Sequence, residues 1–213
     1  ATHAAPQIDG LWPDRKRIVA WLNNEGPGKR IVMRNFQSAL NATTEELVTW
    51  MHEKPVDPKY GSKVREMYCS ALGGRMGVLK VFDIHGAWHH EVEEILKEHD
   101  PALVIADMID NIKFGGEVLN NGQRTDQLLE GMYQWGRMMA VKYDGAWIAN
   151  SQLSADADGV AFPTLPQLKD SKTGKQGAAD VILTGGALND PMLEWDRYLG
   201  TTKNKKQPTV SKG

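Results

Sequence analysis

Cysteine is almost absent from this sequence, with Cys69 alone among 213 residues. A single thiol forms no intramolecular disulfide, so we expect a reducing, cytoplasmic setting. Long apolar runs are also absent. The longest, at residues 18–22 and 102–106, have five residues, far fewer than the roughly 20 that span a bilayer. We therefore expect no association with a membrane.

An excess of charge of either sign is missing too. The 25 basic and 27 acidic residues give a net charge of −2, which excludes a protein whose whole surface is a basic field for nucleic acid but leaves room for a local basic stripe. The chain opens at Ala1 without an initiating Met or a leader segment. We expect either a processed start or a sequence that begins inside a domain.

Short β-branched or apolar runs alternate with longer helical segments, which predicts an α/β fold with a mostly parallel sheet and crossover helices. Strands are expected at residues 17–22, 78–82, 103–106, 146–149, 180–183 and 197–202. One helix is expected after Gly26-Pro27, with Ile31, Met33 and Phe36 on its apolar face. A second is expected after a capping box at residues 43–46, and two more at residues 88–99 and 125–142. Residues 153–177 are expected to form a long loop.

Polar residues stand directly after three of the expected strands: Asn23-Asn24-Glu25, Asp107 and Asn150-Ser151-Gln152. Ligands of open α/β sheets bind at the carboxyl edge of the strands, although solubility alone also places polar residues there. An apolar strand that ends in Asp is typical of a Walker B carboxylate that holds Mg²⁺. A neighbouring Glu can polarise a water, and an amide can bind a phosphate. The pattern predicts half of a nucleotide-hydrolysing site.

The other half, a Gly-x4-Gly-Lys-Ser/Thr phosphate-binding loop, does not occur in the sequence. Residues 23–30 (NNEGPGKR) and 169–176 (KDSKTGKQ) contain Gly-Lys but lack the first Gly and the final Ser/Thr. We expect the loop to lie upstream of Ala1.

Residues 85–94 hold three histidines, His85, His89 and His90, and three glutamates. One interpretation is a metal-dependent enzyme that uses this cluster. We favour the other, a helix start with acidic residues near the positive end of the dipole and solvated histidines.

The order of these segments resembles the RecA-like ATPase domain of DnaB-type replicative helicases, especially phage and plasmid versions, over residues 17–208. NNEGPGKRIVMR resembles the segment that carries the catalytic glutamate and a Met-Arg pair, and LVIADMIDNI resembles the Walker B strand. IANSQL resembles the strand that ends in Ser-Gln, and Lys203-Asn204-Lys205 resembles a Lys-x-Arg finger. Lysine at residue 205 lacks the planar fork of arginine.

The resemblance implies a three-layer RecA-like fold in one domain over residues 1–213, truncated before its phosphate-binding loop, with a basic tail at 203–213. It implies ATP and Mg²⁺ as cofactors and roles for six residues in the nucleotide site. These are Glu25 as the catalytic base, Asp107 as the Mg²⁺ ligand through water, Arg34 at the nucleotide, Gln152 as the γ-phosphate sensor, and Lys203 and Lys205 acting on a neighbouring subunit's nucleotide.

The same resemblance implies single-stranded DNA as a partner and a ring-shaped homo-oligomer, a hexamer in the family. The expected DNA phosphate contacts are Lys113, Arg124, Lys169, Lys172 and Lys175. The predicted function is an ATP-dependent DNA helicase core. A recombinase-like or regulatory RecA-type ATPase remains an alternative, as does a fragment that is inactive alone.

Overall fold

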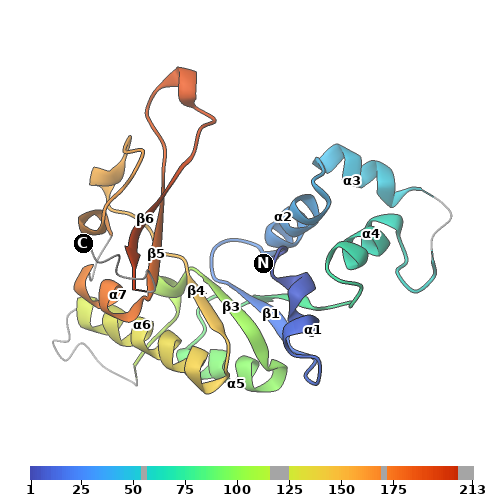
Figure 1. Ribbon diagram of the computed structural model, residues 1–213, viewed down its shortest axis with the longest axis horizontal. Helices are drawn as coiled ribbons and strands as arrows, with labels where there is room; N and C mark the ends of the chain where they lie inside the picture. The colour runs from blue at the N-terminus through green and yellow to red at the C-terminus, as the bar shows by residue number, and fades with distance from the viewer. Residues whose placement is uncertain (54–56, 116–124, 169–171, 206–213) are drawn as a thin grey trace, which may run out of the picture. The chain divides into compact units, whose positions relative to one another are not determined.

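A computed structural model describes residues 1–53, 57–115, 125–168 and 172–205 (Figure 1). The chain divides into two compact units. Unit 1 comprises residues 1–113 and 139–150, and unit 2 comprises residues 114–138 and 151–213. Helix α6 (Thr125–Lys142) begins in unit 2 and ends in unit 1.

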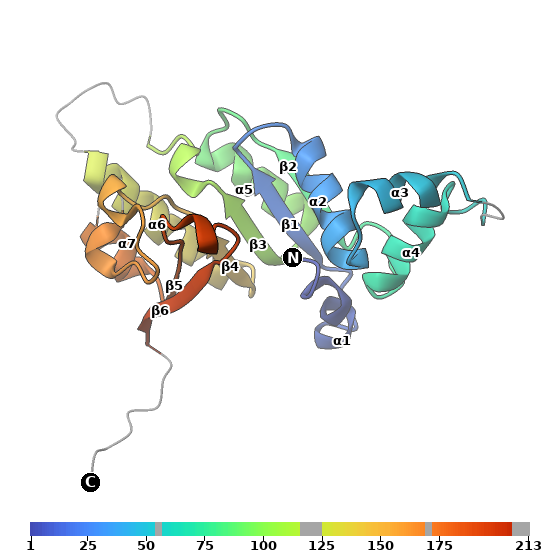
Figure 2. The same cartoon turned by 90° about the horizontal axis from the view of Figure 1, so that it is seen from above.

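Unit 1 contains a four-stranded parallel sheet in the order β2-β1-β3-β4. Its strands are β1 (Ile18–Asn23), β2 (Leu79–Asp83), β3 (Pro101–Asp107) and β4 (Ala146–Ala149). Strands β1 and β3 lie side by side in both views (Figures 1 and 2). The apolar runs of the sequence form the interior of this sheet, so the predicted α/β architecture with a parallel sheet is confirmed.

Helices cover both faces of this sheet. On one face, Val19 and Ile105 pack with residues from α1 (Ile8–Leu11), α2 (Gly28–Leu40) and α4 (Lys63–Ala71). On the other face, Phe82 of β2 contacts His99 of α5 (His89–His99), with 5.0 Å between the ring centroids. Successive strand residues point to opposite faces, which is why this sheet needs a helical layer on each side.

Helix α3 (Thr44–Met51) begins at the predicted capping box, in which the Thr43 hydroxyl accepts from the Glu46 amide and the Glu46 carboxylate accepts from the Thr43 amide. Helix α2 also lies where it was predicted, but Met33 is 39% exposed and does not belong to its buried face. Helix α4 was not predicted. Its buried residues, Val64 and Cys69, are too few to give the segment a clear helical period.

Unit 2 contains an antiparallel ribbon of β5 (Val181–Gly186) and β6 (Tyr198–Asn204), which forms a sheet of its own. Helix α7 (Lys172–Ala178) covers residues 172–177 of the stretch predicted as loop, so that prediction was wrong for these residues. The segment KTGKQGA has no apolar stripe, and its helix is stabilised instead by the side chains of Arg137 from α6, Lys203 from β6 and Lys205 after β6.

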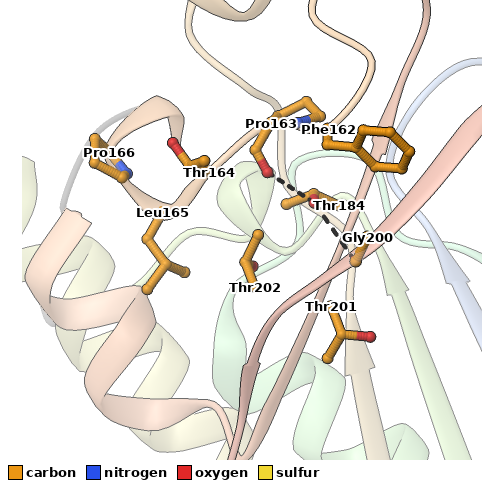
Figure 3. Close-up of a pocket in the computed structure, with 9 residues that line it drawn as sticks. All are labelled: Phe162, Pro163, Thr164, Leu165, Pro166, Thr184, Gly200, Thr201 and Thr202. Carbon is orange, nitrogen blue, oxygen red and sulfur yellow. Dashed lines mark hydrogen bonds between the residues drawn. The ribbon is translucent and has the colours of Figure 1, made fainter.

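Five short 3-10 turns complete the described elements: Ala5–Gln7, Ile109–Asn111, Ala155–Ala157, Leu165–Gln167 and Pro191–Leu193. The segment 162–166 lies against the ribbon and encloses with it a hollow of about 450 Å³ (Figure 3). The Thr184 hydroxyl, which donates to the carbonyl oxygen of Pro163 at 2.9 Å, joins the two walls. None of the described helices is both long and apolar enough to cross a bilayer.

Candidate functional site

Four polar residues lie in a row at the carboxyl edge of the unit 1 sheet. Asn23 of β1 pairs in register with Asp83 of β2 on one side and with Asp107 of β3 on the other. Asn150 follows Ala149, the β4 partner of Ala106. Across the edge the order is therefore Asp83, Asn23, Asp107, Asn150, with carboxylates and amides alternating. We call these four residues the polar row.

Amide donors hold both carboxylates of the polar row. Asn23 Nδ2 donates to Asp83 Oδ1 at 2.6 Å, and Asn150 Nδ2 donates to Asp107 Oδ1 at 3.0 Å. Trp21 Nε1 donates to the second Asp107 oxygen at 3.3 Å. No lysine or arginine among the described residues forms an ion pair with Asp107. Asp107 is thus oriented by neutral donors, and its negative charge is left for a ligand.

The loop after β1 carries Glu25 beside this row. Its turn passes through Gly26, whose φ of +73° is a conformation that favours glycine. The Gly26 carbonyl accepts from Asn23 Nδ2 at 2.8 Å and pairs with His85 Nε2 at 2.9 Å. Glu25 itself is exposed, and its carboxylate has no partner among the described residues. The backbone is therefore anchored next to a carboxylate that remains available to solvent or ligand.

Asp83 also lies at the start of α2. A methyl group on Gly28 would stand 2.8 Å from the Asp83 carboxyl carbon, so only glycine fits there. The N-cap residue Pro27 supplies no side-chain hydrogen bond, and Asp83 instead places a negative charge against the positive end of the helix dipole. Asp83 was not predicted as a site residue from the sequence, although it ends an apolar strand, the same pattern that marked Asp107.

Two buried polar atoms at this edge have no hydrogen-bond partner among the described residues, Asn23 Oδ1 and Asn24 Nδ2. The backbone of Asn24 is fully used: its amide donates to the Asp107 carbonyl at 2.6 Å, and its carbonyl accepts from Asn111 Nδ2 at 3.4 Å. A buried polar atom left unpaired costs stability. Such atoms concentrate where a ligand or an ordered water completes the bonding.

The chemistry of Asp107 fits Mg²⁺. Magnesium is usually held by one or two carboxylates and keeps several water ligands, and Asp107 offers a fixed carboxylate with lone pairs to spare. The described residues contain no group of three or more His, Cys, Asp and Glu side chains that could enclose a metal. His85 is bonded to the Gly26 carbonyl, and the rings of His89 and His90 meet edge to face at the start of α5. The donor set therefore fits a water-bridged ion at Asp107.

Two other predicted nucleotide contacts, Arg34 and Gln152, do not belong to the polar row. Arg34 is exposed on the outer side of α2. Gln152 is the second residue after Asn150, belongs to unit 2, and is exposed.

Lys203 of β6 and Lys205, the first residue after this strand, lie at the carboxyl end of α7. Lys203 Nζ donates to the Gln176 carbonyl, and Lys205 Nζ donates to the Gly177 carbonyl at 3.2 Å. Desolvation, followed by repulsion from Lys205, lowers the pKa of Lys203. Arg137 of α6 donates to the next carbonyl, that of Ala178, at 2.7 Å. Sequence reasoning missed Arg137, because only the tertiary fold brings it to α7.

Of the predicted DNA contacts, Lys113 is exposed, with its ammonium 5.8 Å from the Trp88 ring centroid. Lys175 is 3% exposed. Its ammonium donates to Ser151 Oγ at 2.7 Å and lies 5.4 Å from the Tyr133 ring centroid. Arg124 and Lys169 lie outside the described residues, and Lys172 is described only as a backbone position of α7.

No family model and no curated protein sequence matches the chain. Solved structures do match. One is an ATPase domain, with a TM-score of 0.65 at 16% identity over 97% of this chain and 72% of that one. Another is a DnaB-like replicative helicase, solved to describe its interactions with primase, with a TM-score of 0.66 at 16% identity. That match covers 98% of this chain and about half (51%) of the other. The predicted RecA-like fold of helicase ATPase domains is thereby confirmed.

Proposed function

We propose that the chain is the core of an ATP-dependent DNA helicase, in which nucleotide hydrolysis is coupled to translocation on single-stranded DNA within a ring-shaped oligomer. The observation that carries the proposal is the polar row, which presents beside the loop of Glu25 an oriented Asp107 that has no cationic partner among the described residues. This arrangement occurs in a fold shared with helicase ATPase domains.

In this proposal Asp107 binds Mg²⁺ through water, and Trp21 and Asn150 keep the carboxylate in one orientation. Bound Mg²⁺ and ATP would supply a polarised γ-phosphate. Glu25 acts as the general base and accepts a proton from water at its carboxylate. The bonds of Asn23 and His85 to the Gly26 carbonyl hold the backbone from which Glu25 projects.

The remaining roles come from the resemblance. Gln152 senses the γ-phosphate, Arg34 contacts the nucleotide, and Lys203 and Lys205 act on the nucleotide of a neighbouring subunit. Lys113 contributes a DNA phosphate contact from an exposed position. Assembly into a hexamer belongs to the same proposal.

The absence of Gly-x4-Gly-Lys-Ser/Thr from the 213 residues supports a second candidate function. Without that loop the chain has no cradle for the β- and γ-phosphates, so hydrolysis requires a phosphate-binding loop from outside these residues. By itself the chain would then act as a binding module that is inactive as an ATPase.

The test compares the 213-residue chain with the same chain joined to whatever its gene encodes upstream. We expect the longer protein to hydrolyse ATP faster when single-stranded DNA is added and to displace the strand of a forked duplex. Glu25→Gln should lower the hydrolysis rate by about 10²–10⁴-fold, the range of general base catalysis. Nucleotide affinity should stay within about threefold, since the variant keeps the shape of the side chain and removes no contact to the nucleotide.

Glu53→Gln is the matched control, because Glu53 is exposed and its side chain has no partner among the described residues. Undiminished turnover in Glu25→Gln would remove Glu25 from the mechanism. DNA-stimulated hydrolysis with strand pairing but no displacement would favour a recombinase-like ATPase. An upstream sequence without a phosphate-binding loop, together with failure to bind ATP, would leave the binding module.

A further inference from the structure

Lys175 of α7 is a buried cation that contacts two other parts of unit 2. The residue is 3% exposed. Its ammonium donates to Ser151 Oγ, in the loop after β4, at 2.7 Å, and it lies 5.4 Å from the ring centroid of Tyr133 on α6. All three residues belong to unit 2, in which α7 lies beside the start of α6 in both views (Figures 1 and 2). Lys175 therefore joins the loop after β4 to these two helices.

Burial strengthens the bond between Lys175 and Ser151. An ammonium that is removed from water loses its hydration, and the hydrogen bond and the aromatic ring replace part of that loss. Water cannot readily take the place of a broken bond at a position that is 3% exposed. A hydrogen bond is also stronger in surroundings of low dielectric constant than at the surface. The Ser151 hydroxyl is thus held at one place on α7.

The loop is anchored on the other side of Gln152 as well. Leu153 forms an isolated antiparallel bridge with Leu168, which pairs the loop with the segment before α7. Gln152 therefore stands between Ser151, which is bonded to Lys175, and a residue whose backbone is bridged. Gln152 itself is exposed. The backbone is fixed on both sides of a residue whose side chain can reach a ligand.

We propose that Lys175 is a positioning residue for Gln152: through Ser151 it fixes the backbone from which the Gln152 side chain projects. The role of Gln152 at the γ-phosphate rests on the proposed function, whereas its fixation by Lys175 rests on the contacts above. A polar group contributes most to a reaction when its supporting residues hold it in one place. This role differs from the DNA phosphate contact expected from the sequence, because the Lys175 ammonium is buried and donates inside unit 2.

The first test measures the anchoring in the 213-residue chain, without nucleotide or turnover. A peptide covering residues 150–154 includes two hydrogen-bonded amides, those of Asn150 and Ser154. Its hydrogen exchange, measured by mass spectrometry, should be about tenfold faster in Lys175→Met, because one anchor of the loop is lost. Ser151→Ala should have the same effect, and the two changes together no more than either alone, since both remove one bond. Ser151→Thr keeps the hydroxyl and should exchange like the wild type.

Lys16→Met is the matched control, because Lys16 is an exposed lysine whose side chain has no partner among the described residues. It should change the exchange of residues 150–154 by less than about twofold. Lys175→Met replaces a buried charge with an apolar side chain of similar length, which proteins often tolerate. Its thermal midpoint should therefore stay within about 4 °C of the wild type. If this variant unfolds, the comparison of Ser151→Ala with Ser151→Thr decides the anchoring.

The second test uses the longer protein, joined to its upstream sequence, that the proposed function requires. Gln152→Ala should lower kcat by about 10²-fold, as for the loss of one oriented hydrogen-bond donor. Lys175→Met should lower kcat by about tenfold and leave KM for ATP within about twofold. The double variant should be no slower than Gln152→Ala alone, because positioning has an effect only while Gln152 is present. A general weakening of the fold would slow both backgrounds equally.

Unchanged exchange of residues 150–154 in both Lys175→Met and Ser151→Ala overturns the proposal. Faster exchange with losses of kcat that multiply in the double variant also overturns it, because Lys175 then acts independently of Gln152. Unchanged exchange with weaker binding of a short oligo(dT) to Lys175→Met than to Lys16→Met assigns Lys175 to DNA instead. If the longer protein hydrolyses no ATP, the proposed function fails, and the exchange result alone decides whether Lys175 fixes the backbone at Gln152.

Discussion

The two edges of the unit 1 sheet differ in how far their buried polar groups are hydrogen-bonded. At the amino edge, the fully buried guanidinium of Arg17 donates to the carbonyls of Pro101 and Asp144, each at 2.7 Å, and to that of Tyr143. The Trp12 ring covers it at 4.8 Å. At the carboxyl edge, Asn23 Oδ1 and Asn24 Nδ2 are just as buried and have no partner among the described residues.

The difference separates a structural polar site from the candidate functional site. Arg17 is a charge enclosed by carbonyls that need donors, so the amino edge is complete without any ligand. The carboxyl edge keeps amide atoms unpaired within the described residues and a carboxylate with no cation among them. Bonding left incomplete in the folded protein is available to a ligand, which is why the proposed function is assigned to this edge.

The largest change in stability is expected from removing the Arg17 guanidinium, which completes the hydrogen bonding of the amino edge. Arg17→Met should lower the free energy of unfolding by about 3–5 kcal/mol, because it leaves several buried carbonyls without a donor. Urea denaturation measures this. Arg15→Met is the control, since Arg15 forms an exposed ion pair with Asp100 at 2.6 Å, and should cost less than about 1 kcal/mol. Equal losses in the two variants would contradict the structural role of Arg17.

An intermediate effect is expected where Asp83 meets Gly28. Gly28→Ala should cost about 2 kcal/mol, because the added methyl group forces the carboxylate away from Asn23 and the start of α2. In an Asp83→Ala background the same change should cost nothing, since the clash is gone and alanine favours the helix. A double-mutant cycle measured by urea unfolding gives the coupling. Additive losses would show that the close approach does not matter.

The smallest effect, with the opposite sign, is expected at the incomplete edge. Asn24→Leu replaces a buried amide, whose Nδ2 has no partner among the described residues, with an apolar side chain of similar length. It should raise the free energy of unfolding by about 1 kcal/mol. Asn150→Leu is the contrast, because the Asn150 amide is bonded to Asp107. This variant should lower the free energy of unfolding by about 1 kcal/mol. A loss of stability in Asn24→Leu would mean that its amide is paired within the folded chain.

The sequence predicted the elements of unit 1 better than their contacts. Apolar runs located β1 to β4, and the capping box located α3, because both signals act within a few residues. The candidates Glu25 and Asp107 at the carboxyl edge could also be identified from the sequence, because parallel strands bring their C-terminal residues to one edge of the sheet.

Contacts between distant residues gave no local signal. The bond between Arg17 and the Asp144 carbonyl joins residues 127 apart, and that between Arg137 and the Ala178 carbonyl joins residues 41 apart. Helix α7 was missed for the same reason, because the distant side chains of Arg137, Lys203 and Lys205 stabilise it and its own composition does not. Arg137 therefore became a candidate only in the folded chain, whereas Asp83 ends an apolar strand and had the same local signal as Asp107.

The spacing of the strands sets the distance between Asp83 and Asp107, the two acidic residues of the polar row. Adjacent strands are about 4.8 Å apart, so Asp83 and Asp107, separated by β1, stand about 10 Å from each other. A cation with ligand distances of about 2.0–2.6 Å cannot be shared across that gap. The two aspartates therefore have separate surroundings: Asp83 lies at the positive end of the α2 dipole, and Asp107 has no cationic partner among the described residues.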